Sequence, residues 1–243
     1  MIIGQDFQKL EWHFMGFDFL EPNALIGDSI ILIIALFFAF KTNKLQNENP
    51  FFKYWSYFFI LFGISFFIGG LGHFCFNYWG VRGKYFSWFA GIFSAYIIEY
   101  AMLGILPNLS LRKTLKRIAL IKLVVFIFFE AFLLTRYSIE SNPQKGLVLP
   151  TIFSFIGLGL TLGLLSVSYQ RKIAKSFRFF WMSTLILVPN VIIQGLKINI
   201  HPYFDKNDFS HLLLIISMFF YFKALSGIDQ ELNGKLLVPK KVL

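Results

Sequence analysis

Three of the four histidines lie near the ends of apolar segments, and one of them follows an acidic residue closely. His73 closes one apolar segment, His201 follows another, and His211 lies three residues after Asp208 in the last. Imidazole and carboxylate ligands that leave one coordination position open are typical of catalytic zinc, whose bound water becomes a nucleophile near neutral pH. These residue types predict a zinc site of His73, His201, His211 and Asp208, with Asp208 also a candidate catalytic residue.

The acidic residues of this group also have a structural interpretation. Asp205 precedes the last apolar segment, where an N-cap side chain accepts backbone hydrogen bonds. Asp208 falls in the first turn, where a negative charge is favourable beside the helix N-terminus. A histidine at a helix end can likewise hydrogen-bond a neighbouring helix. The sequence leaves the metal site and the structural cluster open as alternatives.

Further polar residues recur at helical spacing. Asn190, Gln194, Lys197 and His201 follow one another at steps of four, three and four, which predicts one polar face on a helix that Pro202 ends. Polar groups in hydrocarbon must find partners, so such side chains are expected to face one another. The predicted polar pocket beside the zinc ligands comprises Glu21, Asn23, Asp28, Asn190, Gln194, Lys197, Asp205 and Asn207.

The elements that must position these residues are seven apolar stretches, each long enough to cross the hydrocarbon core of a bilayer. Hydrophobic residues make up 56% of the chain and the mean hydropathy is +0.64, which excludes an ordinary soluble domain. We predict an all-α bundle of seven transmembrane helices in a domain of residues 23–226, between an extracytoplasmic segment 1–22 and a basic cytoplasmic tail 227–243. The predicted spans are residues 23–40, 54–76, 85–106, 118–135, 147–169, 179–200 and 209–226.

Charge gives the expected orientation. The net charge is +10, but lysine and arginine are distributed by loop rather than gathered in one patch, so no nucleic-acid partner is expected. Most of them follow the first, third, fifth and seventh apolar stretches, which predicts an N-terminus outside and a C-terminus in the cytoplasm. The frequent use of Phe, Ile, Lys and Asn suggests a bacterial inner membrane.

Two acids and one lysine lie deeper in the predicted spans. Glu99 and Glu130 are costly in hydrocarbon unless paired or protonated, and each is either a functional residue or a structural hydrogen-bond partner. For Glu130 the structural alternative is a hydrogen bond with Tyr137, seven residues further on. Lys122 is expected to extend its ammonium group toward the cytoplasmic interface. The lone Cys75 allows no internal disulfide.

Three motifs carry a family resemblance. They are Glu21-Pro22-Asn23 through Asp28, Gly69-Gly70-Leu71-Gly72-His73, and residues 204–211. With these motifs the chain resembles the seven-helix superfamily of alkaline ceramidases and progestin and adiponectin receptors. The resemblance implies a zinc-dependent hydrolase that cuts an amide bond in a lipid, with His73 and His211 as metal ligands.

This chain departs from the family pattern at three places. Gly69 stands where the family has a serine, which leaves Ser65, one turn deeper, as the nearest candidate catalytic serine. Asn207 stands at the first histidine of the last helix. Residues 79–88 offer no aspartate near the start of the third helix, only the positive charges of Arg82 and Lys84. A three-histidine site therefore requires His201.

Two functions follow from these residues. The first is a metal-dependent hydrolase of a membrane lipid or acyl-amide, with zinc as cofactor. The second is a non-catalytic binding protein or accessory subunit of a membrane complex, in which the polar cluster only holds helices together and the partner is a lipid or another membrane protein.

Overall fold

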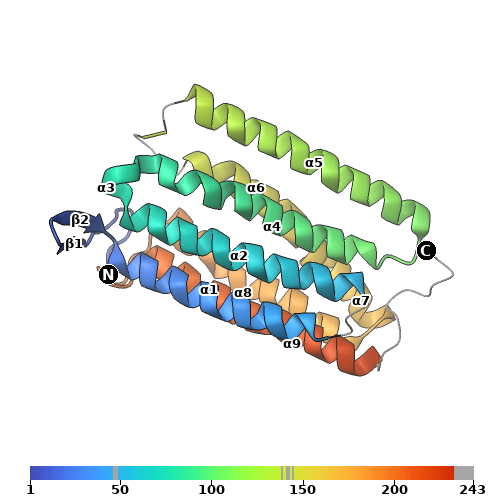
Figure 1. Cartoon of the computed structure of the whole chain (residues 1–243). Helices are drawn as coiled ribbons and strands as arrows, with labels where there is room; N and C mark the ends of the chain where they lie inside the picture. Colours follow the sequence, from blue (N-terminus) through green and yellow to red (C-terminus); the bar gives the residue numbers. More distant parts are fainter. Residues whose placement is uncertain (46–48, 138, 141–142, 144, 233–243) are drawn as a thin grey trace.

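A computed structural model describes residues 1–45, 49–137, 139–140, 143 and 145–232 of the chain. Within these residues, seven helical spans are long and apolar enough to cross a membrane, which confirms the predicted all-α bundle and fits an integral membrane protein (Figure 1). The spans are Pro22–Asn43, Pro50–Phe74, Phe76–Gly104, Leu109–Arg136, Lys145–Lys172, Lys175–Gly195 and Lys206–Leu232.

Four spans are single helices and three are composite. The single helices are α1 (Pro22–Asn43), α2 (Pro50–Phe74), α5 (Leu109–Arg136) and α9 (Lys206–Leu232). The third span contains α3 (Phe76–Trp79), the 3-10 turn η1 (Gly80–Lys84) and α4 (Tyr85–Gly104). The fifth contains α6 (Lys145–Leu158), the π-helical segment η2 (Gly159–Leu165) and α7 (Ser166–Lys172). The sixth contains η3 (Lys175–Phe177) and α8 (Arg178–Gly195).

Several predicted boundaries were wrong. The fourth span begins at Leu109, not residue 118, because the Asn108 side chain caps the helix by accepting a hydrogen bond from the Leu111 amide. The sixth ends at Gly195, not residue 200. Residues 227–232, assigned to the tail, belong to α9, and the rest of that tail, 233–243, lies outside the described residues.

A short β-hairpin precedes the bundle and was not predicted. Strands β1 (Glu11–Phe14) and β2 (Phe17–Leu20) pair antiparallel. The two residues between them, Met15 and Gly16, have φ angles of 49° and 79°, as tight hairpin turns require. The hairpin lies beside the start of α1 and near α3 (Figure 1), and we call this the hairpin end of the bundle.

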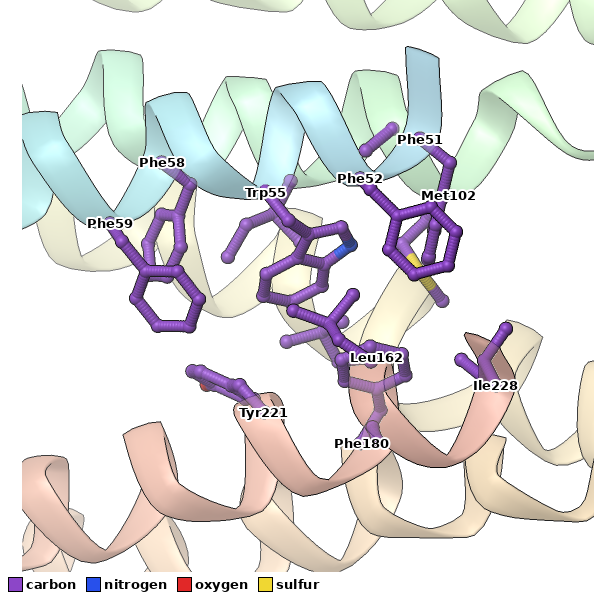
Figure 2. Close-up of a cluster of buried hydrophobic side chains, with 14 of the residues drawn as sticks. Phe51, Phe52, Trp55, Phe58, Phe59, Met102, Leu162, Phe180, Tyr221 and Ile228 are labelled. Carbon is purple, nitrogen blue, oxygen red and sulfur yellow. The ribbon is translucent and has the colours of Figure 1, made fainter. Parts of the chain in front are cut away.

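The core of the bundle is built from aromatic rings. Trp55 of α2 is fully buried and stacks on Phe180 of α8, with ring centroids 4.7 Å apart. Tyr221 of α9 closes the same cluster (Figure 2). Phenylalanines such as Phe52 and Phe59 therefore fill the interior, while others, such as Phe128 and Phe155, remain exposed to the surrounding lipid.

Helices α1 and α2 lie close together because small residues meet between them. A Cβ atom placed on Gly63 would come within 2.8 Å of the Ala35 side chain and 3.3 Å of the Leu32 backbone. The absence of a side chain at Gly63 is therefore what permits this backbone approach.

Replacing Gly63 by alanine is expected to lower the free energy of unfolding by about 1–3 kcal/mol, because the backbone of α1 must move away. Gly91 in α4 is the matched control, since a Cβ atom there meets nothing within 4 Å. Gly91→Ala is expected to be neutral or to stabilise by up to about 1 kcal/mol. Unfolding in detergent measures both, and equal effects of the two changes would contradict this account of α1–α2 packing.

Candidate functional site

His73 joins two oppositely charged side chains at the hairpin end. Its Nδ1 atom lies 2.7 Å from Glu21 Oε2, and its Nε2 atom lies 3.1 Å from Lys84 Nζ. Lys84 Nζ also lies 3.4 Å from Nδ1, so the ammonium group lies against the ring beside both nitrogens and not on the lone pair of Nε2 alone. An ionised carboxylate can only accept, so the ring proton sits on Nδ1, which donates to Glu21. The carboxylate, the imidazole and the ammonium group thus form one contiguous cluster, in which both ring nitrogens of His73 have a charged neighbour.

The backbone brings these three residues together from separate elements. Glu21 is the N-cap of α1 and adopts a left-handed conformation with φ 49°. His73 lies in the last turn of α2, and Lys84 ends η1. Gly72 and Gly83 lie in contact, since a Cβ atom on Gly72 would come within 2.6 Å of the Gly83 carbonyl oxygen. This close approach is what places Lys84 beside His73.

Glu21 is held in its charged form. Burial opposes ionisation, but the hydrogen bond from His73 and the positive charge of Lys9, whose Nζ lies 3.0 Å from Oε2, outweigh it and lower the pKa of Glu21 from 4.5 to about 2. The side chain is 13% exposed. Glu21 therefore remains an anion at every physiological pH.

Asp28 and His211 form a second pair deeper in the bundle. Asp28 Oδ1 lies 3.5 Å from His211 Nε2, and both side chains are largely buried. Gly70 makes room for the carboxylate, because a Cβ atom there would come within 2.8 Å of Asp28 Oδ2. Among the described residues, Asp28 Oδ1 and His211 Nδ1 have no hydrogen-bond partner. We call Glu21, Asn23, Asp28, His73, Lys84, Asp208 and His211 the polar cluster. Of these described residues, Asp28 and His211 are the members that have buried polar atoms without a partner.

Asp208 and Asp205 cap α9, as the structural interpretation expected. The Asp205 carboxylate accepts from the Asp208 amide at 3.2 Å, and the Asp208 carboxylate accepts from the Asp205 amide at 3.0 Å. Asp208 Oδ2 also accepts from Asn23 Nδ2 at 3.0 Å, which ties α1 to α9. One of the two carboxylate oxygens of Asp208, Oδ2, thus already has two donors.

The polar face of α8 is shorter than predicted. Gln194 Nε2 donates to Asn207 Oδ1 at 3.2 Å and to Ser210 Oγ at 2.7 Å, and Ser210 in turn donates to Asn190. These contacts join α8 to α9. Ser210 was missed because a single serine in an apolar segment gives no pattern of its own.

The prediction that Lys197 and His201 continue this face was wrong, because α8 ends at Gly195 and Lys197 has a φ of 48°. The buried Asn199 explains the early end: its side chain binds the Gln5 carbonyl at 2.9 Å and accepts from the Lys206 amide at 2.9 Å. These contacts hold the segment after α8 in a non-helical path.

The N-terminal segment is bound to the same loop. Asp6 forms ion pairs with Lys206 and with Lys197, the latter at 3.5 Å. Burial alone would raise the pKa of Asp6, but the hydrogen bond and charge of Lys206 lower it. Ile2 pairs with Asn199 in an isolated β-bridge. Ile2, Gln5 and Asp6 thus bind the first residues of the chain to the segment between α8 and α9.

His201 does not join His73 and His211. It is exposed in the turn before α9, where its Nδ1 accepts from the Tyr203 amide at 3.2 Å and its ring stacks on that of Tyr203. In the part of the chain that the structure describes, no group of three or more His, Cys, Asp or Glu side chains is placed to hold a metal ion. The predicted set of His73, His201, His211 and Asp208 is therefore not gathered into one such group.

Ser65 has a structural contact. Its hydroxyl donates to the Ser87 carbonyl at 2.9 Å, which joins α2 to α4 within the bundle. The side chain is buried, and this bond satisfies its only donor.

The deep charged residues form a separate polar site between α4, α5 and α6. Lys122 Nζ donates to Glu99 Oε1 at 2.8 Å, so the expected extension of Lys122 toward the interface was wrong. Gly157 of α6 leaves room for Glu99.

Glu130 does not reach Tyr137. Neither of its carboxyl oxygens has a hydrogen-bond partner among the described residues, although it is fully buried.

Comparison with known proteins gives one match. Residues 24–230 match a family of unknown function, DUF6962. The chain belongs to this family. No curated protein and no solved structure matches it. The matched region contains all seven spans except the first two residues of the first and the last two of the last. The polar cluster at the hairpin end therefore falls within it apart from Glu21 and Asn23, and so does the Glu99–Lys122 ion pair.

The low pKa of Glu21 predicts a specific pH dependence. Because its folded pKa of about 2 is below 4.5, its contribution is complete above pH 4.5 and is lost as the pH falls toward 2. Glu21→Gln is expected to cost roughly 3 kcal/mol of unfolding free energy at pH 7 and progressively less below pH 4.5. The control is Glu11→Gln, which removes an exposed carboxylate. If the loss of unfolding free energy in Glu21→Gln stayed constant down to pH 2, the low pKa of Glu21 would be contradicted.

The Glu99–Lys122 pair predicts a non-additive double variant. Lys122→Met leaves a buried carboxylate without its cation and is expected to cost about 3–5 kcal/mol of unfolding free energy. Adding Glu99→Gln removes that charge, so the double variant should be more stable than Lys122→Met alone. Lys113→Met, on the exposed face of α5, is the control and should change little. A double variant that is less stable than Lys122→Met would argue against the pair.

Proposed function

We propose that this protein is a non-catalytic membrane binding protein or accessory subunit whose cluster at the hairpin end is structural. Its partner is a membrane lipid or another membrane protein. From the distribution of lysine and arginine, we further propose that the hairpin end faces the outside of a bacterial inner membrane and that the C-terminus is cytoplasmic.

The contact between Lys84 and His73 carries this proposal. A zinc ion needs a free nitrogen on a histidine ring. At His73 the Nδ1 atom donates to Glu21, and the Lys84 ammonium lies against the ring, 3.1 Å from Nε2 and 3.4 Å from Nδ1. The cluster thus contains its own cation, which balances Glu21. A second cation at the same place would meet the repulsion of Lys84 and would have to break its hydrogen bond.

The other candidate catalytic residues support the same proposal. Asp208 caps α9, and Ser65 donates to the Ser87 carbonyl. A general base or nucleophile needs a free polar atom within reach of a substrate. Each of these two groups is instead engaged in holding one element to another.

The metal-dependent hydrolase remains the second candidate, and one observation favours it. Asp28 Oδ1 and His211 Nδ1 are buried without partners among the described residues. Buried polar atoms of this kind are rare and can mark a site for an ion or ligand. His211 and Asp28 would offer such an ion one imidazole from α9 and one carboxylate from α1.

Metal analysis of two purified proteins separates these functions. The wild-type chain, purified without chelator and incubated with zinc, is expected to hold much less than one zinc per chain. Lys84→Met removes the ammonium group but keeps most of the side-chain volume. It is expected to lower the melting temperature, because Glu21 and His73 lose their cation, while amide hydrolysis of lipid substrates stays at background.

Lys116→Met is the matched control. Lys84 lies over the ring of Phe76 and Lys116 over the ring of Tyr100, but Lys116 is outside the polar cluster. One tightly bound zinc per wild-type chain, lost on His73→Ala and His211→Ala substitution, would overturn the proposal. So would unchanged stability of Lys84→Met together with a new hydrolytic activity, because Lys84 would then block a site rather than complete a cluster.

A further inference from the structure

The β-hairpin separates its residues onto two chemically different faces. Residues directly opposite each other in an antiparallel pair lie on the same face, and the register pairs Trp12 with Phe19 and Phe14 with Phe17. One face is therefore entirely aromatic. The other carries His13 opposite Asp18, whose Nδ1 and Oδ1 atoms lie 2.5 Å apart, and Glu11 opposite Leu20.

The hairpin is fixed to the bundle through its aromatic face and through the edge of β2. Phe19 stacks on Phe74, at the end of α2, with ring centroids 4.2 Å apart. The Asp18 amide donates to Tyr78 Oη at 2.8 Å, and Asn77 Nδ2 donates to the Asp18 carbonyl at 3.0 Å. The hairpin thus holds a defined position at the end of the second and third spans.

Part of the aromatic face is left uncovered. Phe14, Met15 and Phe17 are 48%, 82% and 54% exposed. Apolar side chains gathered at the tip of a small hairpin are costly in water, and such a patch marks a surface that contacts another apolar phase. The polar residues of the opposite face are exposed as well, so the hairpin is amphipathic.

Exposed aromatic residues continue from the hairpin onto the bundle. Phe17 contacts Tyr78 with ring centroids 6.0 Å apart. Tyr78 and Trp79 of α3 and Phe86 at the start of α4 are about half exposed. Aromatic side chains at the ends of membrane-spanning helices are typical of the boundary between headgroups and hydrocarbon. The hairpin tip therefore extends a surface that the bilayer already covers.

We propose that the aromatic face of the hairpin inserts into the headgroup region of the leaflet at the hairpin end, as an interfacial anchor of this chain in its own membrane. Phe14, Met15 and Phe17 enter the lipid, while Glu11, His13 and Asp18 stay in water. The anchor is joined to the polar cluster, because the Glu21 amide donates to the Leu10 carbonyl at 2.8 Å and Lys9 binds Glu21. The inference is independent of whether the cluster is structural or catalytic.

Site-directed spin labelling of the full chain tests this inference. Cys75 is the only cysteine, so Cys75→Ser provides a background without a reactive thiol. In that background Phe14→Cys and His13→Cys are neighbours on opposite faces, and Phe17→Cys with Asp18→Cys repeats the comparison on β2. Each labelled protein is reconstituted in vesicles of phosphatidylethanolamine and phosphatidylglycerol, and its relaxation by oxygen and by a water-soluble nickel chelate is measured.

Labels at positions 14 and 17 are expected to be several times more accessible to oxygen than to the nickel chelate, and labels at 13 and 18 to show the reverse. Equal accessibility to the chelate at all four positions would place the hairpin in water and overturn the inference. Protection of 14 and 17 from both reagents, with spin–spin broadening between chains, would also overturn it and would indicate a contact between copies. Two independent pairs keep the test decisive if one variant misfolds.

Discussion

Within the hydrocarbon of a bilayer, no water is available to a polar group, so each one must be satisfied by the protein itself. This constraint explains why the chain spends most of its length on seven helices, whose backbone bonds close internally. It also explains the charged contacts. Lys122 binds Glu99 instead of extending toward an interface, and the Glu21 carboxylate is balanced by Lys9 and by Lys84 through His73. Among the described residues Glu130 departs from this rule with both carboxyl oxygens, and Asp28 Oδ1 and His211 Nδ1 depart from it too. An isolated buried carboxyl is least costly in its neutral form.

The polar cluster shows how the same residue types can serve structure rather than chemistry. Histidines and acids from α1, α2 and α9 converge at the hairpin end, as their positions along the helices predicted. What decides their role is the atom that each one contacts. His73 has the Lys84 ammonium against its ring, and Asp208 has two donors on one oxygen. Such contacts depend on side-chain direction and cannot be derived from spacing.

Features that follow from long apolar segments could be predicted from the sequence. Features that depend on a few tertiary contacts, such as the end of a helix, could not. The number of spans and the convergence of Asn23, Asp28, Asp208 and His211 could be predicted, because length and helical period are strong signals. The end of α8 could not, since Asn199 holds the following residues in place. The hairpin was missed although its aromatic and polar residues alternate, because ten residues beside a strong helix gave a weak signal. Lys84 was noted only as a positive charge, and its contact with His73 depends on the close approach of Gly72 and Gly83.

The π-helical segment η2 changes the phase of the fifth span. Buried residues recur four apart at Phe153 and Gly157 of α6 and at Thr161 of η2, and Leu162 beside Thr161 is buried as well. Beyond η2 the buried positions are Ser166 and Tyr169, so the step from Thr161 to Ser166 is five residues. The wider turn of η2 thus inserts one extra residue, and the side chains of α7 are rotated about the helix axis relative to those of α6. By this rotation the Tyr169 hydroxyl points inward and donates to the Met102 carbonyl at 2.8 Å, while Ser168, which a regular helix would have turned inward, lies at the margin. A local irregularity in one helix therefore determines which side chain secures the far end of another.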